Sequence, residues 1–368
     1  MPLTLTVDGR AWDSHLDGFA AARPGIIPVC KGNGYGFGLA RILDRAARLP
    51  GVDTVAVGTM SELATVPASG PASDCDVLVL TPDPAAEVPA GGPRAERVVR
   101  TASTVGDVEV ALTAGHRFVV ECRTDLQRHG VAVEDLRELV AVLARHPDRR
   151  GLLAGWGLHL PLARPGTWSG VVEARVGALR AAGLDPATVH VSHLGVAELA
   201  ALAATLPGTR LRPRVGTDLW LGDRAALVPT ATVLDVHRLP RGAPAGYWQR
   251  HAPGPGWVVV AAGGTAHGIG LTAPPPPMVR RRLGALRSAV GDTTGRARSP
   301  FLLDGVALDF FEPPHMQVSL LWLPAAGGRH RPVKAPEPPE PPARGAELTV
   351  RVRYTTTSFD RVVVTGST

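Results

Sequence analysis

One lysine of this chain stands where a reactive amine would be expected. Lys31 and Lys334 are the only lysines among 39 basic residues, so nearly all the positive side-chain charge is arginine. Lys31 ends the apolar run 26–29 and opens a turn with four glycines in seven residues, followed closely by Tyr35. Arginine can replace lysine as a charge, but only lysine loses its proton near neutral pH and attacks a carbonyl. The pattern predicts that Lys31 is a functional amine.

The glycines after Lys31 indicate an anionic ligand. Glycine lets the backbone approach a ligand closely and present its N–H groups to an anion. Tyr35 could add a hydroxyl to a phosphate. The turn is not a P-loop, because its lysine precedes the glycines instead of following them.

The elements around Lys31 alternate between β-branched runs and segments of helical period. About eight such units between residue 26 and residue 222 predict an α/β fold, an N-terminal (β/α)8 TIM barrel. Sites in this fold lie where strands end, which is the position of Lys31. We expect the barrel to span residues 8–222. The runs lie at 26–29, 52–57, 77–80, 98–99, 118–120, 152–160, 189–192 and 211–215.

After Gly222 the pattern becomes β-rich, with Gly and Pro between short alternating runs. This change predicts a C-terminal mostly-β domain over residues 223–368, with a strand from residues 1–7 added to it. Two proline tracts, 274–277 and 336–342, indicate loops or spacers.

Composition limits the class of partner. The net charge of +6 is mild, and no basic run is interleaved with aromatic residues, so nucleic acid is not expected. No stretch of about 18 apolar residues would span a membrane. Three cysteines without metal-type spacing, and residues 1–8 without signal-peptide features, predict a cytoplasmic protein with reduced thiols.

Residues 31–38, Lys-Gly-Asn-Gly-Tyr-Gly-Phe-Gly, resemble the cofactor-lysine motif of the alanine racemase family. The resemblance extends from about residue 3 to 361 and weakens after residue 260. It implies pyridoxal 5′-phosphate (PLP) bound on a barrel that a β domain follows, and a homodimer with shared active sites.

Further segments resemble family motifs in the same order, and the resemblance implies their roles. One group of residues would face the cofactor ring, one would bind its phosphate, and Tyr247 would act as the second catalytic base, contributed across the dimer interface. The ring group is Arg128, His159 and Arg214; the phosphate group is Tyr35, Ser192, Gly216, Thr217 and Tyr354. Arg128 would also face the substrate.

These roles imply an amino-acid racemase or epimerase with a two-base mechanism. Lys31 would serve one face of the substrate Cα and Tyr247 the other. The unperturbed pKa of tyrosine is about 10, so nearby positive charge would have to lower it. We expect that charge on the side of Arg214 and His159.

Several positions depart from the family pattern. Phe37 replaces a histidine, and Glu121 stands where many members have a lysine; we hypothesise that Glu121 orients Arg128. On the substrate side, Thr265 replaces a tyrosine, and Gln317 replaces an aspartate after Met316. The substrate-binding residues would be Arg128, Thr265, His315, Met316 and Gln317, and the substrate is expected to be an amino acid other than alanine.

The departures keep alternatives open. Another PLP reaction on this scaffold could be decarboxylation, aldol cleavage or elimination, and an inactive PLP-binding paralogue is a further alternative. His315 suggests a metal site as another alternative, as in the related D-threonine aldolases. Gln317 is a poor zinc ligand, however, so no metal is expected.

Overall fold

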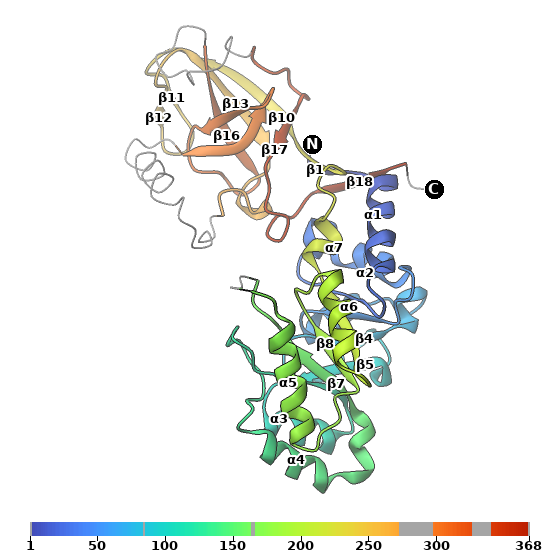
Figure 1. Ribbon diagram of the computed structural model, residues 1–368. Helices are drawn as coiled ribbons and strands as arrows, with labels where there is room; N and C mark the ends of the chain where they lie inside the picture. The colour runs from blue at the N-terminus through green and yellow to red at the C-terminus, as the bar shows by residue number, and fades with distance from the viewer. Residues whose placement is uncertain (1, 84, 163–165, 272–296, 326–339, 367–368) are drawn as a thin grey trace. The chain divides into compact units, whose positions relative to one another are not determined.

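The computed structural model describes residues 2–83, 85–162, 166–271, 297–325 and 340–366. The proline tract 274–277 lies outside these residues, as does the tract from 336 to 339. The chain divides into two compact units. Figure 1 colours the chain by residue number, from blue at the N-terminus to red at the C-terminus. The barrel unit is Asp13–Gly34 with Gly38–Gly222, and the β unit is Met1–Trp12, Tyr35–Phe37 and Asp223–Thr368.

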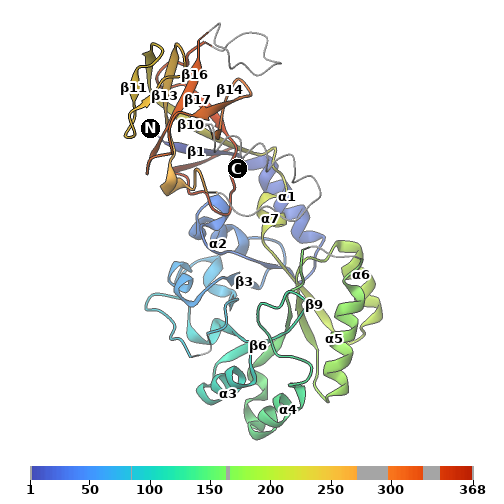
Figure 2. The same ribbon diagram turned by 90° about the vertical axis from the view of Figure 1, so that its left-hand side faces the viewer.

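The barrel unit contains eight parallel strands in the order β2-β9-β8-β7-β6-β5-β4-β3. A parallel bridge from Val29 to Ala56 joins the first and last strands of this order, which nearly closes the sheet. Figure 2 shows this sheet with its helices outside it. The predicted TIM barrel is confirmed. Its strands are β2 (Ile27–Pro28), β3 (Thr54–Val57), β4 (Asp76–Val79), β5 (Val98–Ala102), β6 (Arg117–Cys122), β7 (Leu153–Leu158), β8 (Thr188–Val191) and β9 (Arg210–Val215).

Not every barrel strand is followed by an α-helix. After β3 and β4 the chain forms only short 3₁₀ turns, whereas α-helices follow the later strands. The segment 58–97 is rich in Pro, Gly and Ser, which explains this, because proline cannot donate an N–H inside a helix. The helices are α1 (Gly9–Ala21), α2 (Leu39–Ala47), α3 (Val105–Ala114), α4 (Leu136–Arg145), α5 (Ser169–Ala181), α6 (Val196–Thr205) and α7 (Thr217–Leu221). The 3₁₀ turns are η2 (Met60–Thr65), η3 (Pro71–Asp74) and η4 (Ala95–Arg97).

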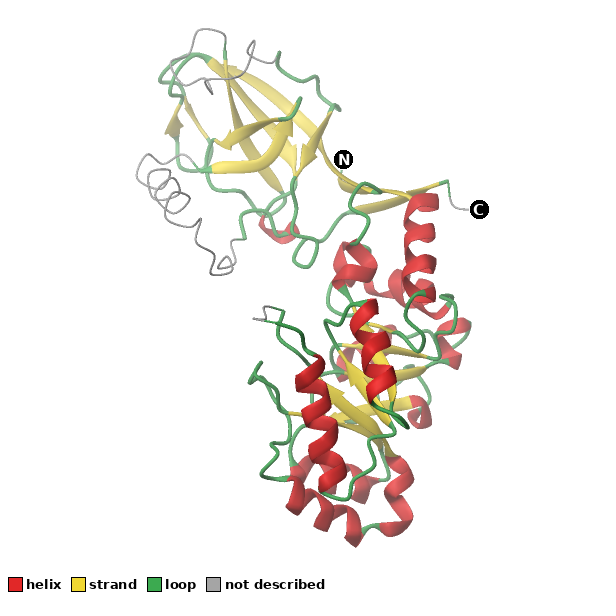
Figure 3. Cartoon of the chain, viewed as in Figure 1, coloured by secondary structure: helices red, strands yellow, loops and turns green. Residues whose placement is uncertain are grey.

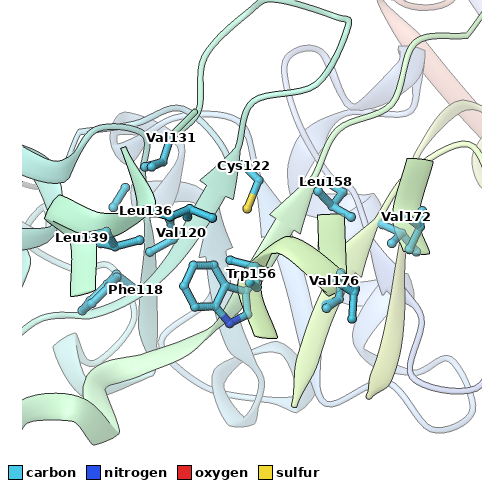
Figure 4. Packing of buried hydrophobic residues seen from close by; sticks show 14 of the residues in the cluster. Phe118, Val120, Cys122, Val131, Leu136, Leu139, Trp156, Leu158, Val172 and Val176 are labelled. Atoms are coloured by element: carbon cyan, nitrogen blue, oxygen red, sulfur yellow. The ribbon is translucent and has the colours of Figure 1, made fainter. Parts of the chain in front are cut away.

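Strand alternation sorts the barrel side chains into two cores. On β6, Phe118, Val120 and Cys122 pack against the helices in the cluster shown in Figure 4. Val119 belongs to a second cluster drawn from neighbouring strands, without helix residues, so it lies inside the barrel. Successive strand residues face opposite sides, which places Glu121 on the interior face with Val119.

The β unit is built on an eight-stranded sheet of order β13-β16-β15-β14-β17-β10-β1-β18. β13 also pairs with β10, so six of these strands close on themselves around an apolar core. Strand β1 pairs antiparallel with β10 and parallel with β18. Figure 3 shows the strands in yellow. They are β1 (Leu3–Asp8), β10 (Leu227–Leu239), β13 (Gly256–Ala262), β14 (Arg298–Leu303), β15 (Val306–Phe310), β16 (Val318–Pro324), β17 (Glu347–Val350) and β18 (Arg361–Thr365).

The three cysteines, Cys30, Cys75 and Cys122, are buried free thiols. Among the helices of the described ranges, none is long and apolar enough to cross a membrane.

Trp156 on β7 tests the packing of the barrel. Its ring is fully buried and its Nε1 donates to the Asp185 carbonyl at 3.0 Å. We expect Trp156→Ala to lower the free energy of unfolding by about 3–5 kcal/mol, since it leaves a cavity. Urea denaturation of the purified protein measures this. The exposed Val110→Ala on α3 should stay within about 0.5 kcal/mol of wild type. Equal effects of the two variants would contradict the packing described.

Candidate cofactor and active site

The strand that leads to Lys31 is fixed from three directions. The Val29 N–H donates to Val215 on β9 at 2.8 Å, and the Cys30 N–H donates to Ala56 on β3 at 2.6 Å. The Trp220 indole of α7 donates to the Val29 carbonyl at 2.9 Å. The backbone that carries Lys31 is therefore held at the carboxyl end of β2, as expected for a barrel active-site residue.

Glu62, in η2, holds the residues beside Lys31. Its carboxylate accepts the Gly58 N–H at 2.6 Å and the Gly32 N–H at 2.8 Å. No motif in the sequence singles out Glu62. The one sequence feature that could have identified Glu62 is its acidic side chain shortly after the second predicted strand. Acidic residues at such positions are too common to indicate a function.

The charges around Lys31 favour its neutral amine. Desolvation lowers its pKa, and the positive charges of Arg128 and Arg214 lower it further, while Glu62 opposes them. A neutral amine is the nucleophilic form. The surroundings of Lys31 thus shift its amine towards the nucleophilic form.

Arg214 on β9 and Glu121 on β6 form a buried ion pair across the barrel interior. The two guanidinium–carboxylate distances are 2.8 and 3.0 Å, and each side chain is only 3% exposed. Gly157 on β7 makes room for them, because a Cβ there would collide with the Glu121 carboxylate. Burial raises the pKa of Glu121, but the charge and hydrogen bonds of Arg214 outweigh it and lower the pKa overall. Both carboxylate oxygens accept from Arg214, so among the described residues the arginine that Glu121 orients is Arg214 and not Arg128, as had been hypothesised.

One nitrogen of Arg214, the Nε, is free of the ion pair and can donate a hydrogen bond to a ligand. Within the described residues, its buried Nε has no hydrogen-bond partner. A buried donor without a partner is costly, so a ligand acceptor is expected there. A pyridine nitrogen would satisfy it.

Two histidines lie beside this arginine. The rings of His159 and His193 meet edge to face, with centroids 5.6 Å apart. Desolvation, then Arg214 and Arg128, lower the pKa of His159 to about 3, so its ring is neutral. His159 therefore cannot supply the positive charge expected on its side, which leaves Arg214 to supply it. Thr124, not singled out in the sequence, fixes the end of β7 by donating its hydroxyl to the His159 carbonyl at 2.5 Å.

The remaining predicted barrel residues occupy the same strand ends. Arg128 is exposed in the turn after β6, where Gln127 adopts a left-handed φ of 51°. The Ser192 hydroxyl accepts the Leu160 N–H at 2.9 Å, which leaves its own proton to donate. Gly216 and Thr217 form the start of α7, where the first N–H groups of a helix have no intrahelical partner.

The β unit contains both tyrosines expected to bind phosphate. Tyr35 and Tyr354 are buried, and a Cβ on Gly36 would lie 3.4 Å from the Tyr354 ring. The Arg224 guanidinium lies 4.9 Å from the centre of that ring. Burial raises the pKa of Tyr354 while Arg224 opposes the shift, so the phenol stays protonated and able to donate.

The predicted substrate-side residues also gather in the β unit. The Thr265 N–H donates to the His315 carbonyl at 2.8 Å, and the Gly263 N–H donates to the Gln317 carbonyl at 2.9 Å. Met316 between them is exposed. His315 packs on Tyr247, with ring centroids 4.4 Å apart. Thr265, Met316 and Gln317 thus lie on one pair of turns with the residue that supports Tyr247. The described residues contain no group of three His, Cys, Asp or Glu that could hold a metal ion.

Comparison with known proteins identifies the barrel. Residues 14–193 match the family model described as "Alanine racemase, N-terminal domain". The barrel belongs to the alanine racemase family. The resemblance found in the sequence is thereby confirmed. A search of curated protein sequences returned no significant match.

Solved structures share the fold over the whole chain at low identity. Alanine racemase from Streptomyces coelicolor is 18% identical, covers 100% of this chain and 98% of its own, and gives a TM-score of 0.63. Alanine racemase from Bartonella henselae, with covalently bound pyridoxal phosphate, is 14% identical, with coverages of 99% and 100% and a TM-score of 0.64. Histidine racemase from Leuconostoc mesenteroides is 16% identical, with coverages of 99% and 98% and a TM-score of 0.61.

The neutrality of His159 gives a test by pH. Because the folded pKa lies near 3, the ring should stay neutral at all pH values above it. The unfolded chain takes up this proton near pH 6.5, so folding should lose stability as pH falls from there towards 3. NMR titration of the histidine Cε1–H signals measures this, with His159→Gln to assign the peak. A midpoint near 6.5 in the folded protein would contradict the geometry.

Proposed function

We propose that this protein is a PLP-dependent amino-acid racemase or epimerase that acts by a two-base mechanism. The observation that carries the proposal is that two features occur in the same barrel. Lys31 has a lowered pKa, and the buried Arg214 has an Nε without a hydrogen-bond partner among the described residues. PLP, when bound, supplies an electron sink for the substrate Cα. Lys31 would hold the cofactor and then serve as base on one face.

Arg214 would set the protonation of the cofactor ring. A guanidinium cannot give up its proton, so a ring nitrogen facing it must act as acceptor. Such a ring withdraws electrons less strongly, which favours brief proton exchange at Cα over side reactions. This supports racemisation over the decarboxylation, aldol cleavage and elimination alternatives.

Tyr247 would be the second base, supplied by a second copy of the chain. Its side chain is 82% exposed, and Trp248 beside it is 75% exposed. Two neighbouring exposed aromatic residues are typical of a surface that a partner covers. We therefore propose a homodimer with shared active sites.

The substrate is proposed to be an amino acid other than alanine. Thr265, Met316 and Gln317 come together on the turns that support Tyr247. A small threonine and a neutral glutamine replace the tyrosine and aspartate of the family pattern, which leaves room and polarity for a larger side chain. The histidine racemase with this fold shows that the scaffold serves other amino acids.

Lys31→Ala tests the cofactor anchor. We expect the purified wild-type protein, incubated with PLP, to show the visible absorbance band of lysine-bound PLP, and the variant to lack it. Lys334→Ala, at the chain's other lysine, is the matched control and should keep the band. After borohydride reduction, mass spectrometry should find the adduct on the Lys31 peptide. No band in wild type would favour the inactive-paralogue alternative.

Mixed dimers test the second base. The substrate is first found by screening L- and D-amino acids for exchange of the Cα proton in heavy water. Lys31→Ala and Tyr247→Phe should each abolish racemisation of that substrate. When the two variants are unfolded together and refolded, about a quarter of wild-type sites should return, because each mixed dimer then holds one intact site. No recovery, in a sample whose mixed dimers are verified by native mass spectrometry, would place both bases in one subunit.

A further inference from the structure

The β unit contains a buried carboxylate that neither the resemblance nor the two-base proposal assigns. Glu312 is fully buried at the side-chain level, in a segment followed by Pro313 and Pro314. Burying a carboxylate is costly unless several donors satisfy it. Its donors are therefore informative about what the carboxylate does.

Among the described residues, all of its donors belong to the turn of the proposed second base or to the ring that packs on it. Oε1 accepts the Tyr247 N–H at 3.0 Å, and Oε2 accepts the Trp248 N–H at 3.2 Å. Oε1 also accepts from His315 Nε2 at 2.5 Å. One buried group therefore holds the backbone of Tyr247 and the imidazole beside it.

The turn is shaped to admit this carboxylate. Gly246, immediately before Tyr247, has a φ of 77°, which favours glycine. A Cβ on Gly246 would collide with the Glu312 carboxylate. The glycine thus allows the turn to close directly onto Glu312.

The charge state of the carboxylate fixes the histidine. Burial pushes the pKa of Glu312 up, but hydrogen bonds from His315, Trp248 and Tyr247 outweigh it and lower the pKa overall. An ionised carboxylate only accepts, so His315 Nε2 carries the proton. This orients the imidazole, whose ring lies tilted against the phenol ring of Tyr247, with centroids 4.4 Å apart.

We infer that Glu312 and His315 are positioning residues for Tyr247, with Glu312 holding its backbone and His315 bracing its ring. The inference rests on the proposed function, since it matters for catalysis only if Tyr247 is a base. His315, expected from the resemblance to bind substrate, has its Nε2 occupied by Glu312. The phenol of an exposed residue is thereby held in one orientation, and a base misplaced by about 1 Å can lose a hundredfold in rate.

The test separates the two faces of the substrate Cα. In heavy water, exchange of the Cα proton is followed at early times from the L and the D enantiomer separately. The amino acid used is the one that exchanges with the wild-type protein in the heavy-water screen of L- and D-amino acids. Each enantiomer presents its proton to one base. Glu312→Gln keeps the shape but replaces one acceptor oxygen with a donor. We expect exchange at the Tyr247 face to fall about tenfold or more, with the Lys31 face within about twofold of wild type.

A second variant and a control sharpen the result. His315→Phe keeps a ring against Tyr247 but removes the proton given to Glu312, so a smaller loss at the same face is expected. Glu347→Gln, a surface substitution of the same type in the β unit, should change neither face. Equal loss at both faces in Glu312→Gln, or no loss at either, would overturn the inference.

A measurement without substrate completes the test. Hydrogen exchange of the full-length protein, read by mass spectrometry on peptides covering Tyr247 and Trp248, should be about tenfold faster in Glu312→Gln. Unchanged exchange would also overturn the inference. If Tyr247→Phe leaves both faces unaffected, the two-base proposal itself fails; if it silences one face and Glu312→Gln does not, only the positioning role fails.

Discussion

The buried pair of Arg214 and Glu121 is the interaction on which the chemistry of the barrel depends. A guanidinium in the barrel interior would be prohibitively costly without a carboxylate in bidentate contact. Burial lowers the pKa of both Lys31 and His159, and the fixed charge of Arg214 adds to both shifts. The same guanidinium thus helps to favour the neutral form of the amine and of the imidazole.

The β unit uses a buried carboxylate in a similar way. Glu121 orients an arginine side chain, whereas Glu312 orients a stretch of backbone and an imidazole. In both places a glycine leaves the space the carboxylate occupies, Gly157 in the barrel and Gly246 in the turn. Buried charges satisfied by several donors hold their partners more rigidly than exposed pairs do, which suits groups that must meet a reacting atom accurately.

The barrel was predictable from the sequence because strand and helix periods are local properties. The uneven distribution of helices has a local cause too, since the Pro- and Gly-rich segments that follow β3 and β4 form 3₁₀ turns and not α-helices. The side-chain partners of the buried charged residues were not predictable from the sequence. Glu121 was expected to orient Arg128, yet it faces Arg214, because both lie on the interior faces of strands that are far apart in sequence.

The sequence by itself determined the barrel and the position of Lys31 at a strand end. It also placed the family's functional residue types in their order along the chain. Only the tertiary structure decided the role of Glu62 and Glu312 and the partner of Glu121, since these depend on which distant backbone groups lie within hydrogen-bond distance. Motifs record residue types and spacing along the chain, whereas a carboxylate's function is set by the donors that folding brings to it.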